Sequence, residues 1–135
     1  MTGVKANSLG KTERLKSRKQ IDILFSSGKK ITVFPFRLIY LSHTGSGLVK
    51  AGFTVSSKNF PKAIERNRIK RLSREAYRVE NSALKAAVQV NKLQLQLFFI
   101  YTGREILSFQ EVNAPLKKVL EKLVRIIHEG HSANT

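Results

Sequence analysis

Cysteine and tryptophan are absent from this chain of 135 residues, and long apolar runs are missing as well. Without cysteine the chain has no disulfide, no thiol nucleophile and no thiolate ligand for zinc. The longest purely apolar run, residues 97–101, is far too short to cross a bilayer, and residues 1–19 lack the apolar segment of a signal peptide. These absences predict a soluble, cytoplasmic protein with no membrane partner.

Acidic residues are also scarce, with nine aspartates and glutamates against 25 lysines and arginines, so the net charge is +16. Residues 1–30 and residues 58–78 each hold eight basic and two acidic residues, so each block carries +6 and the two together hold 12 of the 16 excess charges. Charge of this density indicates a polyanionic partner. A hydrophobic fraction of 41% is enough for one modest core, so the chain is not a disordered basic tail.

The spacing of apolar residues predicts one domain over residues 14–129, between a flexible basic arm (residues 1–13) and a flexible tail (residues 130–135). The predicted helices cover residues 17–27, 62–78 and 83–90, and a last helix capped by Asn113 with Pro115 in its first turn. The predicted strands cover residues 31–41, interrupted by Pro35, and then residues 48–56 and 95–102. Residues 31–41 and 48–56 fit a β-hairpin, and the order αβββααβα, with a short first strand, suggests an α+β sandwich.

Residues 66–78 read Arg-Asn-Arg-Ile-Lys-Arg-Leu-Ser-Arg-Glu-Ala-Tyr-Arg. At about 100° per residue of a helix, the basic side chains gather on one face, and Ile69, Leu72, Ala76 and Val79 lie on another. Cations spaced four residues apart repel one another unless a polyanion neutralises them, although a solvated basic face is the simpler alternative. The helix is therefore predicted to bind a nucleic acid through Arg66, Asn67, Arg68, Lys70, Arg71 and Arg74, with the basic side chains on its phosphates.

The same string resembles the signature of the bacterial ribonuclease P protein family, an Arg-Asn-Arg helix followed by Lys-Arg and Arg-Glu. The matching positions are Arg66-Asn67-Arg68, Lys70-Arg71 and Arg74-Glu75. Outside the helix, the similarity extends over about residues 13–127 and includes Arg14-Leu15-Lys16, Phe25, Gly28-Lys29, Lys58 and residues 52–56.

The resemblance implies a fold and a division of labour. The fold would be a two-layer α/β sandwich, of a kind also found in a ribosomal protein domain, with a mixed four-stranded sheet and the signature helix in a left-handed βαβ crossover. The general rule for such crossovers predicts the right hand instead. A large RNA subunit, bound one to one, would cleave the phosphodiester with Mg²⁺, while the protein, itself without a cofactor or obligate protein partner, holds the 5′ leader of precursor tRNA.

The resemblance also suggests leader or tRNA contacts at Phe25, Phe36, Ile39, Lys16, Arg18, Lys58 and Arg104. Phe25 and Phe36 could stack on bases, but both are equally plausible as core residues. The chain departs from the family pattern at Ile21, where members often carry an aromatic residue, at Ile39, where some members carry a tyrosine, and in residues 59–62, where many members carry a glycine.

Three other classes of function are alternatives to this interpretation. A structural RNA-binding protein of ribosomal type would have the same size and charge, and only the ordered Arg-Asn-Arg string argues against it. A DNA-binding regulator would need a helix-turn-helix pair and a dimer seam, and neither pattern is present. A protein-only nuclease would need clustered acids or histidines, and the scattered acids and histidines predict neither a catalytic residue nor a metal site.

Overall fold

The structure, a computed structural model, describes residues 18–133. Its helices are α1 (Arg18–Ser27), α2 (Ala63–Glu80), α3 (Ser82–Val90) and α4 (Phe109–Ala133), and its strands are β1 (Lys29–Val33), β2 (Phe36–Thr44), β3 (Val49–Val55) and β4 (Leu93–Tyr101). The predicted order αβββααβα is confirmed, including the short first strand and the break between the second and third helices at Asn81. The predicted arm and Lys16 lie outside the described residues.

The four strands form one mixed sheet in the order β1-β2-β4-β3. The strand β2 pairs antiparallel with both β1 and β4, and β3 pairs parallel with β4. The predicted hairpin between residues 31–41 and 48–56 is wrong, because β4 lies between β2 and β3. The loop after β2 crosses the start of β4, where the amides of Gly45 and Gly47 donate to the carbonyl oxygens of Lys92 and Leu93 at 3.0 and 2.8 Å. The hairpin of this sheet is β1–β2, which turns at Phe34-Pro35.

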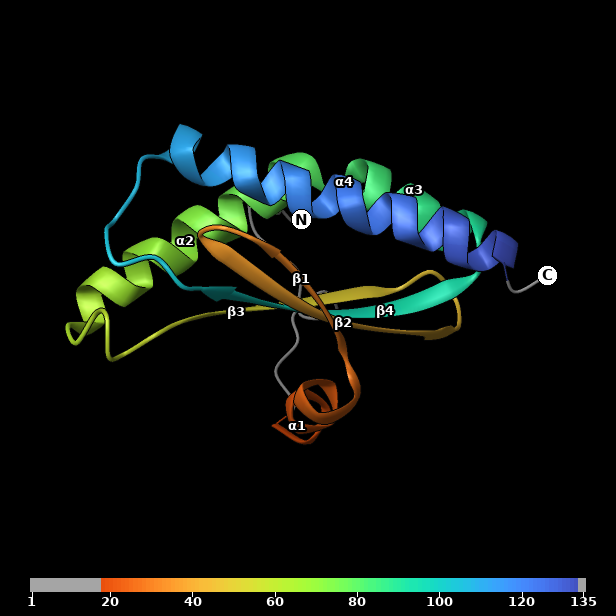
Figure 1. The fold of residues 1–135 in the computed structure, drawn as a ribbon, viewed down its shortest axis with the longest axis horizontal. Coiled ribbons are helices and arrows are strands. Elements are labelled where there is room, and N and C mark those ends of the chain that lie inside the picture. Colours follow the sequence, from red (N-terminus) through yellow and green to blue (C-terminus); the bar gives the residue numbers. More distant parts are fainter. Residues whose placement is uncertain (1–17, 134–135) are drawn as a thin grey trace, which may run out of the picture.

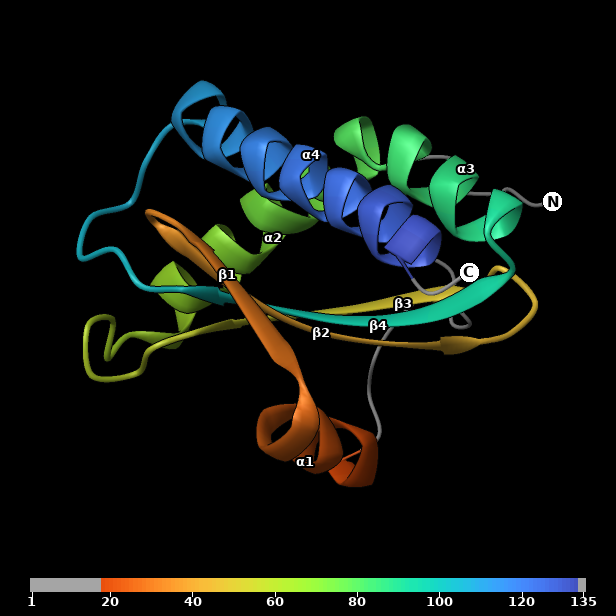
Figure 2. The ribbon, with the colours of Figure 1, turned by 45° about the vertical axis from the view of Figure 1, so that its right-hand side comes forward.

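Three helices cover one face of the sheet, and α1 lies alone on the other (Figure 1, Figure 2). The main core fills the space between the sheet and α2, α3 and α4, with Phe36, Leu97 and Phe99 among its fully buried side chains. Seen along the parallel strands with these helices above, the connection from β3 through α2 and α3 to β4 is left-handed (Figure 2). The general rule was therefore wrong here, and the left-handed crossover implied by the family resemblance is correct.

The last helix begins earlier and ends later than the sequence indicated. Ser108 and Glu111 form a capping box, in which the Ser108 amide donates to Glu111 Oε1 at 3.0 Å and the Glu111 amide donates to Ser108 Oγ at 3.3 Å. Asn113 is not the cap, since it lies inside α4 and its amide nitrogen donates to Glu80 Oε2 at 2.9 Å. Residues 130–133, predicted to belong to a flexible tail, are helical.

Candidate RNA-binding surface

The helix α2 packs on the sheet through a narrow stripe and leaves three of its six basic side chains exposed to solvent. Ile69, Ser73, Ala76 and Tyr77 are buried. Val79, predicted to lie on the apolar face, is 47% exposed. The buried face of α2 is turned toward Tyr77, whose ring packs against Phe53 and Phe99, and Val79 lies outside that face. The exposed polar and basic residues of α2 are Asn67, Arg68, Arg71 and Arg74.

Arg66 and Lys70 lie half-buried at the flank of this exposed row. The Arg66 guanidinium is already engaged, since its Nη1 donates to the carbonyl oxygens of Phe60 and Pro61 at 2.9 and 2.7 Å. Both carbonyls belong to the segment just before α2. Arg66 therefore differs from Arg68, for which no hydrogen bond or ion pair occurs among the described residues.

Glu75 is the acidic residue within the signature string, and it forms an ion pair with an arginine on its own helix. Arg78 donates to the Glu75 carboxylate through Nε, at 3.2 Å, and through Nη2. This hydrogen bonding lowers the pKa of Glu75 and raises the pKa of Arg78. The pair neutralises one arginine locally, so the positive potential of α2 comes from the residues nearer its start.

A second surface is the sheet face that α1 covers only in part. Leu24 of α1 is fully buried against Ile39 and Phe98, and together these three residues form a small cluster separate from the main core. Phe25, the next residue, is 47% exposed and meets the Phe98 ring edge to face, with centroids 5.4 Å apart. Phe98 of the sheet thus supports the accessible ring of Phe25.

Basic residues border this open face. Arg37 is exposed opposite Ile100, and Lys50 is half-buried opposite Gln96. They lie on the open face because they alternate with residues of the main core along β2 and β3. Neither residue was among the predicted contacts, although this alternation in the sequence would have found both.

Comparison with known proteins identifies the family. The family model described as Ribonuclease P matches residues 9–124. The chain belongs to the ribonuclease P protein family. The ribonuclease P protein component of Porphyromonas gingivalis is 32% identical over 125 residues, covering 91% of both chains. That of Chlorobium phaeobacteroides is 33% identical over 135 residues, covering 91% of this chain and 92% of the relative.

Solved structures of ribonuclease P proteins share the fold. The protein from Staphylococcus aureus aligns with a TM-score of 0.62 at 21% identity, covering 84% of this chain and 96% of that one. The protein from Thermotoga maritima also aligns with a TM-score of 0.62, at 24% identity over 82% of this chain and 96% of that one. The chain is thus a bacterial ribonuclease P protein component, a ribonucleoprotein subunit that serves tRNA processing and partners with the ribonuclease P RNA.

Two residues predicted to contact the leader are buried in this ribonuclease P protein. Phe36 has no exposed surface and packs against Phe99 and Tyr101, with ring centroids 6.3 and 5.7 Å apart. Ile39 is 1% exposed beneath α1. Neither side chain can touch the leader in this conformation, so the core alternative holds for Phe36 and the predicted contact at Ile39 is wrong. Phe36 faces the three-helix layer, and Ile39 anchors Leu24.

The other predicted leader contacts that the structure describes are accessible. Arg18, Lys58 and Arg104 are exposed. Lys58 and Arg104 belong to the loops that follow the parallel strands β3 and β4, and these loops are joined where Asn59 Nδ2 donates to the Gly103 carbonyl oxygen at 3.3 Å. The fold therefore brings two basic residues that are far apart in sequence to the same end of the sheet, whereas Arg18 lies at the start of α1.

The placement of Phe25 depends on Gly28, where α1 ends against β2. The Gly28 amide donates to the Leu24 carbonyl oxygen at 2.8 Å. A Cβ atom at Gly28 would lie 2.4 Å from that oxygen and 2.6 Å from Ile39 Cγ2. We expect Gly28→Ala to lower the free energy of unfolding by about 1–3 kcal/mol, because the helix end must shift. Urea unfolding would measure this, and Gly130→Ala, whose Cβ would contact nothing within 4 Å, is the control.

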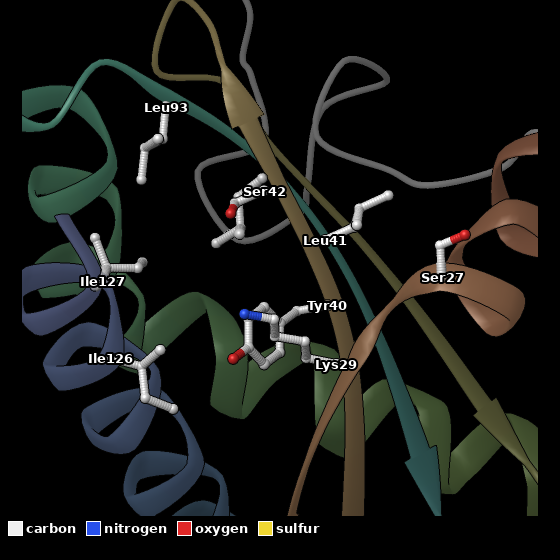
Figure 3. Close-up of a pocket in the computed structure, with 10 residues that line it drawn as sticks. Ser27, Lys29, Tyr40, Leu41, Ser42, Leu93, Ile126 and Ile127 are labelled. Carbon is white, nitrogen blue, oxygen red and sulfur yellow. The ribbon is translucent and has the colours of Figure 1, made fainter. Parts of the chain in front are cut away.

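A cavity of about 270 Å³ lies away from α2, between the sheet and the end of α4 (Figure 3). Lys29, Tyr40, Ile126 and Ile127 are among the residues that line it. Burial raises the pKa of the Tyr40 hydroxyl. Lys29 is the only basic residue among the described residues of its lining, so the cavity does not extend the basic surface.

The described part of the chain contains neither a cluster of metal ligands nor a membrane-spanning helix. Among the side chains that the structure describes, no three of histidine, aspartate or glutamate come together as a metal ion would need. No helix in the described part of the chain has the length and apolarity needed to cross a membrane.

Proposed function

We propose that this chain supports removal of the 5′ leader from precursor tRNA, binding the catalytic RNA through α2 and the leader across the open face of the sheet. The chain is the protein component of an endoribonuclease family. The observation that carries the proposal is the division of the surface. A row of exposed basic residues lies on α2, and an exposed aromatic ring, Phe25, lies on the opposite side of the sheet.

The α2 surface suits folded RNA. Arginine can form paired N–H bonds with phosphate oxygens, and Asn67 can reach a 2′-hydroxyl. Because Arg68 and Arg71 are exposed on a rigid helix, binding them to phosphate displaces only water and counterions. The contact would recognise RNA by shape and charge, since a uniform row of arginine and lysine carries no base code.

The open face of the sheet suits single-stranded RNA such as the 5′ leader. Phe25 offers an exposed ring for stacking, and Arg37 and Lys50 lie on the same face, where they could follow the phosphates of the leader. Lys58 and Arg104 would continue this path at the end of the parallel strands. Arg18 and Lys16 would contribute from the start of the chain.

Catalysis is assigned to the RNA partner, bound one to one and acting with Mg²⁺. Two-metal cleavage of a phosphodiester needs oxygen ligands, which RNA phosphates supply. The protein residues would act by positioning the substrate and screening phosphate charge, both of which favour metal binding by the RNA. Precursor tRNA as substrate would place this work in the cytoplasm.

A 5′ processing assay on labelled precursor tRNA at low Mg²⁺ tests this function. We expect no cleavage by the protein alone, slow cleavage by a bacterial ribonuclease P RNA alone, and strong enhancement when both are present. Cleavage by the protein alone would place the active site in the protein. A lack of enhancement would favour the second candidate, a structural RNA-binding protein, which the basic α2 surface would serve equally well.

A further inference from the structure

The segment of residues 56–62, here called the β3–α2 loop, lies where the two proposed RNA surfaces meet. It leaves β3, which contributes Lys50 to the open face, and enters α2. Lys58 and Lys62 are its exposed basic residues. The conformation of this loop therefore decides where two cations lie between the leader and the catalytic RNA.

Three ties hold the loop in place. The Phe60 side chain is 4% exposed and packs against Tyr101, with ring centroids 6.2 Å apart. The second tie is a pair of hydrogen bonds, in which the Phe60 amide donates to the Ser56 carbonyl oxygen at 3.0 Å and Asn59 Nδ2 donates to the Gly103 carbonyl oxygen at 3.3 Å. The third tie is Arg66 Nη1, which donates to the carbonyl oxygens of Phe60 and Pro61.

The position of Arg66 argues that this third tie is its main role. Arg66 is the fourth residue of α2, in the first turn, where the helix dipole disfavours a cation. The two carbonyl oxygens offset that cost, and they also fix a guanidinium that would otherwise be free to move. Arg68, half a turn further along, is exposed and faces solvent instead.

We propose that Arg66 is a positioning residue, whose guanidinium closes the β3–α2 loop so that Lys58 is presented to the precursor. Its contribution to RNA binding passes through the loop, and the phosphate contacts of α2 come from the exposed residues. The effect on precursor binding rests on the proposed function, whereas the closure of the loop does not depend on RNA.

Amide hydrogen exchange in the free protein tests the closure. In Arg66→Ala we expect exchange at the Phe60 amide to rise about tenfold, because the two carbonyl contacts are lost and the loop opens more often. Arg68→Ala removes the same side chain two residues along α2 and should leave this amide unchanged. Unchanged exchange in Arg66→Ala, or an equal rise in both variants, would overturn the proposal.

A double-mutant cycle on precursor affinity in the reconstituted holoenzyme tests the link to RNA. We expect Lys58→Ala to weaken precursor binding about fivefold in the wild-type background and less than about twofold in the Arg66→Ala background, since the open loop no longer presents Lys58. Multiplicative effects would show that Arg66 contacts RNA independently. A Lys58→Ala variant that is neutral in both backgrounds would refute the role of Lys58, and the exchange experiment would then decide the closure alone.

Discussion

Replacing Arg68 and Arg71 together by alanine should weaken binding to the ribonuclease P RNA about 100-fold at physiological salt. Both side chains are exposed on α2. Each is expected to form a charge-assisted contact with phosphate, and two such contacts at about 1.5 kcal/mol each correspond to roughly 100-fold in affinity. The fold should be unaffected, because alanine favours the helix and neither arginine packs in the core.

The salt dependence of binding separates lost phosphate contacts from indirect damage. Each lost contact with folded RNA should reduce the slope of log affinity against log salt by about 0.7–0.9, so the double variant should lose about 1.6 units. Filter binding or fluorescence titration at several salt concentrations would measure the slope. An unchanged slope with a weakened affinity would mean that α2 acts without direct phosphate contact.

A matched control lies on α4, where Lys122 and Arg125 are also exposed on a helix surface. Lys122→Ala with Arg125→Ala removes the same charge but lies outside the proposed interface. We expect less than a threefold change in RNA affinity from the control, attributable to net charge alone. An equal loss in both double variants would refute a specific role for α2.

Phe25→Ala should weaken precursor tRNA binding about tenfold and leave mature tRNA binding unchanged. A base stacked on an aromatic ring contributes roughly 1–3 kcal/mol, and only the precursor carries a leader to stack. The exposed Phe25 ring is held edge to face against Phe98, so it needs little further ordering on binding. Affinities of the holoenzyme for a matched pair of precursor and mature tRNA would test this.

Phe34 provides the control for this substitution. It is 71% exposed at the β1–β2 turn and lines a hollow with Leu107 and Pro115 at the start of α4, so Phe34→Ala removes a more exposed ring on the side of the sheet away from α1 (Figure 1). We expect the same affinity for precursor and for mature tRNA as in the wild type. If Phe25→Ala lowered the affinity for precursor and mature tRNA equally, the ring would contact the tRNA body or support the core. The proposal that Phe25 contacts the leader would then be wrong.

Local sequence patterns predicted the elements of this fold well and their pairing poorly. Helical spacing and the Asn81 break located α2 and α3, because these signals act between residues close in the chain. The predicted hairpin of residues 31–41 with 48–56 was wrong, since nothing local reveals that β4, which begins only at Leu93, inserts between them. The start of α4 was missed for a different reason, because the Ser108 and Glu111 capping box was readable in the sequence and overlooked.

The sequence by itself determined the charge, the cationic row of residues 66–78 and the family, because composition and residue order need no tertiary contact. Tertiary structure decided which of those residues are available to RNA. It buried Phe36 and Ile39, left Phe25 exposed on Phe98, and turned Arg66 toward the carbonyls of the β3–α2 loop. Exposure and hydrogen-bond partners depend on the packing of segments distant in the chain, and no local pattern encodes that packing.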